Sequence, residues 1–213
     1  MYHTFNVSSN LKIAELRQDP IIVNVSDIDD EFVPEFRQAV SMAVSAQQKV
    51  LPIVIDCYGG NIHSLLSIID TLNTCNISIA TVVLGKAIGA AAVLASCGDE
   101  GLRFIGENST LMLNNISKDS WGETGEFKPD SREVERLHKK ICVILDKNTG
   151  NEKGHFEQLI KDKGGCDWYL DADDALFYRL VDHKKIPHFE INIYPTYKFD
   201  KKEYKEVIFD EVN

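Results

Sequence analysis

The chain has 213 residues, which is enough for one domain with a sizeable hydrophobic core and a small appendage. Its 33 acidic and 23 basic side chains give a formal net charge of −10, which disfavours nonspecific binding to nucleic acid or to anionic membranes. No apolar run approaches the roughly 20 residues of a membrane span, and the first residues show no signal-peptide pattern. We therefore expect a cytoplasmic protein with no membrane or nucleic-acid partner.

The cysteines are five in number and widely spaced, with no CxxC pair among them. An odd number at such spacings indicates reduced thiols rather than a disulfide framework or a zinc site, and we expect no metal and no cofactor. They are Cys57, Cys75, Cys97, Cys142 and Cys166.

The first part of the chain alternates between short apolar runs and amphipathic segments. β-Branched runs at residues 20–25, 50–56 and 77–85 predict buried strands. Apolar residues at helical spacing predict helices over residues 29–48 and 61–75, where Pro34 is tolerable only within a first turn. This alternation favours parallel βαβ units in a sheet that is covered on both faces.

The second part is predicted to contain more helix. A helix of small residues precedes two short strands, and a polar loop with three turn-forming residues then leads into two amphipathic helices. A last short strand precedes a helix capped by an aspartate. These elements are expected at residues 87–97, 103–106, 110–115, 117–131, 132–150, 155–165 and 167–182.

Two glycine-rich turns stand between a predicted strand and a predicted helix. In CYGGN, Gly59 and Gly60 allow positive φ and expose backbone N–H groups near a helix start, where they can hold an oxyanion. In GKAIGAAAVLAS, residues 85–96, small side chains let the backbone approach a ligand or another helix. Each stretch taken alone also fits an ordinary turn followed by a tightly packed helix.

The order of these motifs resembles the Clp protease proteolytic subunit (ClpP), a family within the wider ClpP/crotonase-like superfamily. IDDEF resembles the family's IDDE segment, and IDCYGGN resembles its oxyanion loop INSPGGS. RFIGENSTLMLNN resembles RF.LPNSR.MIHQP, and DWYLDADDALFYRLVD resembles DRFLSA.EA..YGLVD. The resemblance extends from residue 20 to about residue 182. It implies an α/β fold of repeated ββα units in a spiral, with a helical handle.

Under this resemblance the chain divides into three parts. We expect an N-terminal segment at residues 1–19, a ClpP-like domain at residues 20–190 and a C-terminal strand with a charged tail at residues 191–213. The excursion at about residues 118–165 corresponds to the handle that joins two rings in the family.

The resemblance also places the family's catalytic triad on three positions of this chain. The nucleophilic serine falls on Gly89, the histidine base on Asn114 and the orienting aspartate on Asp167. A glycine has no attacking atom, and an amide does not accept a proton at neutral pH. The oxyanion donors remain by type, at Gly59, Gly60 and the N–H of Ala90. These positions predict a fold without serine-peptidase chemistry.

Other residues are considered as relocated catalytic groups. Cys57 adjoins the two glycines and His63 follows six positions later, which is the nearest thiol–imidazole pair along the chain. Ser96 is expected inside a packed helix, away from the turn. His138 and His155 lie on predicted handle helices, where solvated or packing roles are expected.

The resemblance implies a subunit that assembles into heptameric or tetradecameric rings beside an ATP-dependent unfoldase of the AAA+ type. An inactive subunit of this kind could mix with active ClpP subunits and serve a structural or regulatory role. The alternative is an active hydrolase or a crotonase-like acyl-CoA enzyme that uses the retained oxyanion loop. The sequence shows no basic cluster near these loops that would suit the phosphates of coenzyme A.

Overall fold

The computed structural model describes residues 20–114, 131–164 and 167–187. The described elements all belong to one compact unit, Ile21–Phe189. The predicted segment at 1–19, the greater part of the predicted loop at 117–131, the tail at 191–213 and Cys166 lie outside the described residues.

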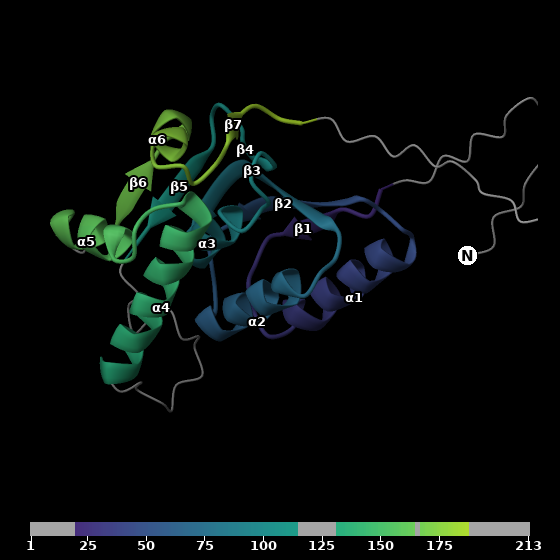
Figure 1. Ribbon diagram of the computed structural model, residues 1–213, viewed down its shortest axis with the longest axis horizontal. Helices are drawn as coiled ribbons and strands as arrows, with labels where there is room; N and C mark the ends of the chain where they lie inside the picture. Colours follow the sequence, from purple (N-terminus) through teal and green to yellow (C-terminus); the bar gives the residue numbers. More distant parts are fainter. Residues whose placement is uncertain (1–19, 115–130, 165–166, 188–213) are drawn as a thin grey trace, which may run out of the picture. The chain divides into compact units, whose positions relative to one another are not determined.

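The described strands form one sheet (Figure 1). Five of them follow the order β1-β2-β3-β4-β7, and each neighbouring pair on this path is parallel. Strand β5 pairs in parallel with the end of β3 and antiparallel with β6. The bounds are β1 (Val23–Val25), β2 (Val50–Cys57), β3 (Ser78–Ile88), β4 (Arg103–Ile105), β5 (Thr110–Leu113), β6 (Trp168–Leu170) and β7 (His183–Lys184).

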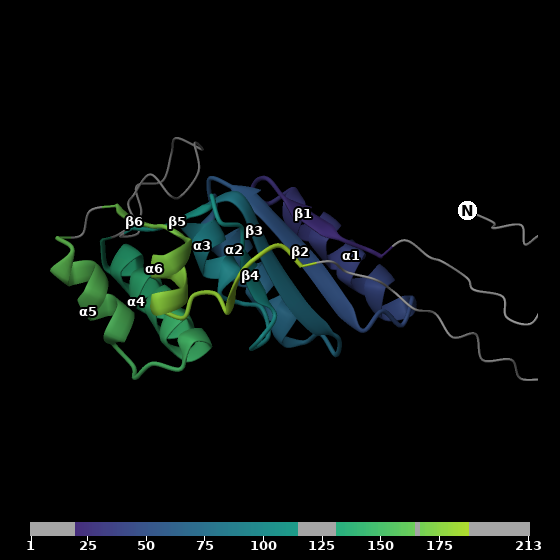
Figure 2. The same cartoon turned by 90° about the horizontal axis from the view of Figure 1, so that it is seen from above.

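The helices gather at two places around the sheet. Helices α1 and α2 lie together beside its β1–β2 end, and Figure 2 shows the strands in front of them. Helices α4, α5 and α6 lie at the other end, near β6 (Figure 1). The bounds are α1 (Phe32–Ser45), α2 (Ile62–Asn73), α3 (Ala90–Ala95), α4 (Ser131–Thr149), α5 (His155–Asp162) and α6 (Ala172–Phe177). No described helix is both long and apolar enough to cross a membrane.

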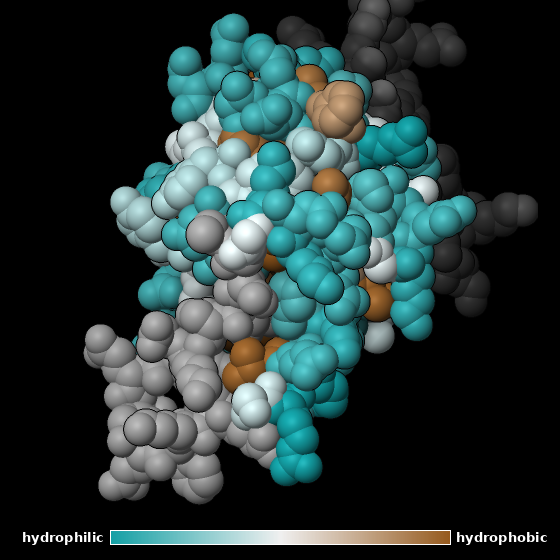
Figure 3. All heavy atoms as spheres, turned by 90° about the vertical axis from the view of Figure 1, so that its left-hand side faces the viewer, coloured by the Kyte–Doolittle hydropathy of each residue, from teal (hydrophilic) through white to brown (hydrophobic). Residues whose placement is uncertain are grey.

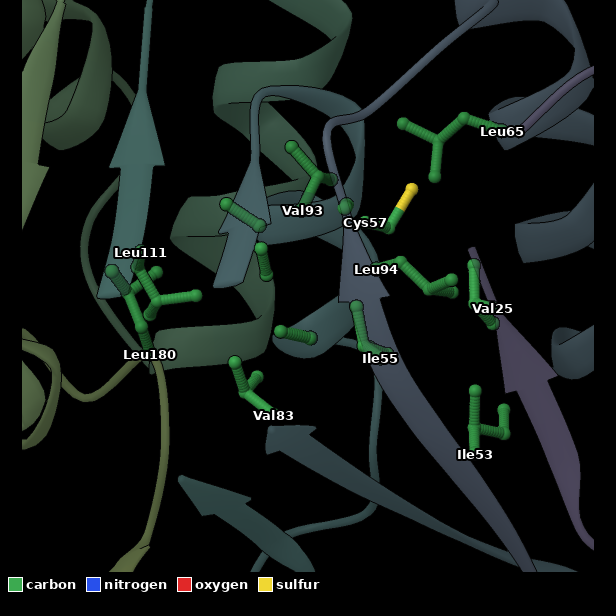
Figure 4. Close-up of a cluster of buried hydrophobic side chains, with 14 of the residues drawn as sticks. Val25, Ile53, Ile55, Cys57, Leu65, Val83, Val93, Leu94, Leu111 and Leu180 are labelled. Atoms are coloured by element: carbon green, nitrogen blue, oxygen red, sulfur yellow. The ribbon is translucent and has the colours of Figure 1, made fainter. Parts of the chain in front are cut away.

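The main core lies between the sheet and these helices (Figure 4). Alternate residues of β2 point into it, and Leu51, Ile53 and Ile55 are fully buried there. On the opposite face of the sheet, Val82 and Phe104 form part of a second, smaller cluster. Both faces of the parallel strands therefore carry buried apolar side chains, as the continuous apolar runs predict.

Side-chain caps fix where two of the helices begin. The Asn61 side chain accepts from the N–H groups of His63 and Ser64, and the predicted Asp171 cap accepts from those of Asp173 and Asp174. Pro34 is the third residue of α1, inside its first turn, where its missing N–H costs nothing.

The structure changes the sequence-based expectation at one strand and adds to it at two others. Strand β3 continues to Ile88 instead of ending near residue 85, because β2 shifts register between Ile55 and Cys57 and Cys57 then pairs with Ala87. Strand β6 runs antiparallel to β5, and β7 was not expected at all. Strands of two or three residues are too short to show a hydrophobic period.

Candidate functional site

The turn between β3 and α3 places Gly89 at its apex. Gly89 has φ 54° and ψ −113°, a conformation that side-chain-bearing residues rarely adopt, and its N–H donates to the carbonyl of Met112. A Cβ atom added at this position would lie 3.4 Å from Oδ1 of Asn114 and would meet no other heavy atom within 4 Å. The apex is therefore a strained strand-to-helix turn with room for a side chain that would face Asn114.

Sheet register brings Asn114 and Asp167 together. The antiparallel strands β5 and β6 pair Leu113 with Trp168, so the next step of the same register sets Asn114 opposite Asp167. Asn114 is half-buried, and Asp167 is exposed. Gly89 therefore faces Asn114, and Asp167 lies one residue beyond the last printed pair of the neighbouring strand.

The glycine loop lies directly against this turn. A Cβ atom on Gly59 would be 2.7 Å from the carbonyl oxygen of Ile88 and 3.5 Å from the backbone nitrogen of Ala90. A Cβ atom on Gly60 would be only 2.2 Å from the carbonyl oxygen of Ile28. Both glycines have positive φ, at 104° and 139°. Close backbone contact on two sides therefore requires glycine at both positions.

The backbone of Ile28 holds this loop in place. Its N–H donates to the carbonyl of Gly59 at 3.1 Å, and its carbonyl accepts from the N–H of Asn61 at 2.6 Å. These two hydrogen bonds involve the carbonyl of Gly59 and the N–H of Asn61, the residues before and after Gly60. The N–H of Gly60 takes no part in them. Sequence reasoning assigned the IDDE segment only to a helix start and missed this role, because nothing in the motif shows which backbone it meets.

Two backbone N–H groups, one at the apex and one in the neighbouring glycine loop, are candidate donors. Ala90 is the first residue of α3, so its N–H has no intrahelical acceptor. Gly60 offers its N–H from the neighbouring loop. Donors of this kind, fixed in position by the fold, can stabilise negative charge on a carbonyl oxygen.

Charged and aromatic side chains border the loop. Lys86 donates to the Asp56 carboxylate at 2.6 Å, and its Nζ lies 4.2 Å from the centre of the exposed Tyr58 ring. The hydrogen bond with Asp56 raises the pKa of Lys86. Lys86 therefore stays protonated and bound to Asp56, so it is not suited to accept a proton as a general base.

The relocated nucleophiles considered from sequence have unsuitable surroundings. Cys57 is fully buried, and its thiol both accepts from the N–H of Gly59 and donates to the carbonyl of Gly59 at 3.2 Å. Burial raises the pKa of Cys57, which disfavours a thiolate. His63 is exposed on α2. Ser96 is fully buried and, as expected, lies away from the turn: it donates to Val93 within the helix end.

The histidines of α4 and α5 lie in surroundings that do not suit catalysis. Burial lowers the pKa of His138, whose Nε2 lies 3.5 Å from Sγ of Cys142 on the same helix. His155 is exposed at the start of α5 and contacts the ring of Phe156 edge-on. Among the described residues, no group of three or more histidine, cysteine or acidic side chains could hold a metal ion.

Comparison with known proteins agrees with this architecture. One crystal structure, described only as that of an enzyme, superposes with a TM-score of 0.66 at 24% identity and covers 78% of this chain and 96% of its own. The crystal structure of a peptidase from Plasmodium falciparum gives a TM-score of 0.64 at 26% identity, with the same 78% and 96% coverage. The family model for Clp protease matches residues 6–184. The chain therefore belongs to the Clp protease family.

Proposed function

We propose that this chain is a ring-forming subunit of a Clp-type protease system that does not hydrolyse peptides itself. The observation that carries the proposal is the empty apex at Gly89, whose absent side chain would face Asn114 at 3.4 Å. The family's fold is present, but the two side chains that would attack the substrate and take up the proton are absent. Its role is then structural or regulatory.

The chemistry follows from what each position can supply. Serine hydrolysis needs a hydroxyl to attack, an imidazole to take its proton and a carboxylate to orient the imidazole. Gly89 supplies no attacking atom, and the Asn114 amide is not basic. Asp167 then has no imidazole to orient. Losing a nucleophile or its base alone costs many powers of ten in rate, so we expect no measurable turnover.

The retained parts support a scaffold that can still receive an extended chain. The glycine loop, the strained turn and the two N–H donors depend on backbone contacts rather than on the missing side chains. A subunit of this kind would keep the walls of a chamber intact and dilute its active sites. We infer partner subunits of the same family, either copies of this chain or active ClpP subunits, and an AAA+ unfoldase.

Two measurements on the purified full chain test the proposal. We expect no labelling by an active-site fluorophosphonate and no hydrolysis of small peptide esters or acyl-CoA compounds. Light scattering should give a ring of about 170 kDa, seven times the 24.0 kDa chain mass, or twice that value. Robust labelling, or acyl-CoA turnover, would overturn the inactive assignment. A monomer at micromolar concentration and physiological salt would overturn the ring assignment.

A further inference from the structure

The exposed face of α4 carries a stripe of basic side chains. Residues 132, 136, 140, 143 and 147 recur at spacings of four, four, three and four, which places them within an arc of about 80° at 100° per residue. All five are exposed. We call this set of four basic residues and one valine the basic stripe: Arg132, Arg136, Lys140, Val143 and Lys147.

The stripe is only partly neutralised within its own helix. Arg136 pairs with Glu133 at 2.6 Å, and Lys139 beside the stripe pairs with Glu135 at 2.6 Å. Within the part of the chain that the structure describes, Lys140 and Lys147 have no ion pair. Like charges four residues apart, as at Arg136 and Lys140, slightly destabilise a helix. Helix stability therefore does not explain the placement of Arg136 and Lys140, although Lys147 in the last turn suits the helix C-terminus.

An exposed apolar side chain sits between the two unpaired lysines. Val143 is 42% exposed, and on the helix surface it lies between Lys140 and Lys147. Figure 3 shows the left-hand side of the molecule as seen in Figure 1, the side of α4 and α5, where small apolar patches are set in a mainly hydrophilic surface. A valine flanked by lysines along one helix face has the layout of a small docking surface with a polar rim.

The charge of the stripe is opposite to that of the chain. With a net charge of −10, most of the surface repels anions, yet this face attracts them. Two copies of the stripe placed face to face would bring lysines against lysines, whether the helices ran parallel or antiparallel. Like charges brought together in this way oppose binding of the wrong partner.

We propose that the basic stripe of α4 docks an acidic helix face of a different polypeptide, and that it disfavours stacking against the same face of a second copy. The matching partner carries carboxylates opposite Arg136, Lys140 and Lys147 and an apolar residue opposite Val143. The identity of the partner rests on the proposed function. For a ring-forming chain, the partner is a subunit of a different kind, and the stacked rings form a hetero-oligomer. The charge pattern itself does not depend on whether the chain forms rings.

A peptide probe tests the stripe separately from ring formation. The probe is a fluorescent helical 18-mer with four glutamates at the spacing of the stripe and a central valine, and its control has glutamine at the same four positions. By fluorescence anisotropy with the full chain, we expect the glutamate peptide to bind roughly tenfold more tightly at about 50 mM salt, and the difference to shrink at about 300 mM. The variant K140E/K147E should lose the preference. K153E, an exposed lysine after α4 and off the stripe, should keep it.

Self-association gives a second, independent readout. A single K140E substitution makes the face self-complementary, because the new carboxylate of one copy can then meet Lys147 of another. We expect light scattering to show a larger stacked fraction for K140E than for the wild type. The mass of the unstacked species, ring or monomer, should be the same for both. Equal binding of the two peptides, tighter binding of a single-stranded oligonucleotide than of the glutamate peptide, or full stacking by the wild-type chain alone would overturn the proposal.

Discussion

Two regions of this fold are held together by different means. Around Gly89, the glycine loop and the turn are fixed by backbone contacts, and the side chains expected for catalysis are absent. At the other region, Arg103 reaches the Asp182 carboxylate through Nε at 2.9 Å and the carbonyl of Asn148 through Nη1 at 2.7 Å. This anchor joins β4, the end of α4 and the segment after α6 through side chains. We refer to it as the Arg103–Asp182 anchor.

The difference explains how chemistry can be lost while the fold stays. A site whose geometry depends on backbone contacts does not collapse when its catalytic side chains are replaced. An anchor built from a largely buried ion pair has less freedom, since removing one partner leaves a poorly compensated charge in the protein. Only 6% of the Arg103 side chain and 17% of the Asp182 side chain are exposed. The two regions should therefore respond differently to substitution.

The largest effect is expected from restoring both missing side chains. In the double variant Gly89→Ser with Asn114→His, the new hydroxyl would face the new imidazole across the space that the apex leaves open, with Asp167 next in register. We expect hydrolysis of a small peptide ester to rise about 10³-fold or more above the wild type, because a nucleophile gains its base. Initial rates and fluorophosphonate labelling measure it.

The two single variants are the matched controls. Each should stay at background, since a serine without a base and a histidine without a nucleophile are both inert. If circular dichroism shows that the double variant is folded but it takes no label, the retained backbone does not hold the two new side chains in a catalytic geometry.

Removing a required glycine should destabilise the backbone-held region. Gly60→Ala forces a Cβ atom to 2.2 Å from the Ile28 carbonyl, so we expect a loss of about 3 kcal/mol in the free energy of unfolding. Gly101→Ala is the control, because Gly101 also has positive φ, at 83°, but has nothing within 4 Å of the new Cβ atom. It should lose about 1 kcal/mol. Equal losses in urea unfolding would contradict the argument from close contact.

The side-chain anchor should respond to pH where the glycine region does not. Partial burial opposes ionisation of Asp182, but hydrogen bonds and the charge of Arg103 outweigh it and lower its pKa. A lowered pKa in the folded state stabilises the protein above the ordinary aspartate pKa, and this contribution is lost as pH falls through the lowered value.

Asp182→Asn should therefore cost about 3 kcal/mol at pH 7 and show a flatter loss of stability below about pH 4 than the wild type. Urea midpoints measured from about pH 3 to pH 7 report both effects. Asp173→Asn is the control, since Asp173 pairs with Lys184 at 2.9 Å while 73% of its side chain stays exposed. An equal cost at both positions would mean that the anchor acts as a surface ion pair.

The sequence predicted the parts of both regions that are local along the chain. Apolar periodicity indicated α2 and β2, and the strand-to-helix glycines indicated the two turns. The sequence alone could not show that the backbone of Ile28 bridges Gly60, or that Arg103 pairs with Asp182. These contacts join residues that are far apart in the chain. The facing of Asn114 and Asp167 was reached only through the family resemblance, and the register of β5 and β6 gives it a physical basis.

The smallest effect is expected at Arg179, whose backbone is strained close to the Arg103–Asp182 anchor. Arg179 follows α6, three residues before Asp182, and has φ 57°, a left-handed conformation that costs energy for any residue with a Cβ atom. Its side chain is exposed, and its N–H donates to Leu176 whatever the side chain is. Arg179→Gly should therefore raise the free energy of unfolding by about 0.5–1 kcal/mol, while Arg179→Ala should leave it nearly unchanged. If both variants lost stability equally in urea unfolding, the arginine side chain itself would be part of the anchor, and the strain would be the cost of keeping it there.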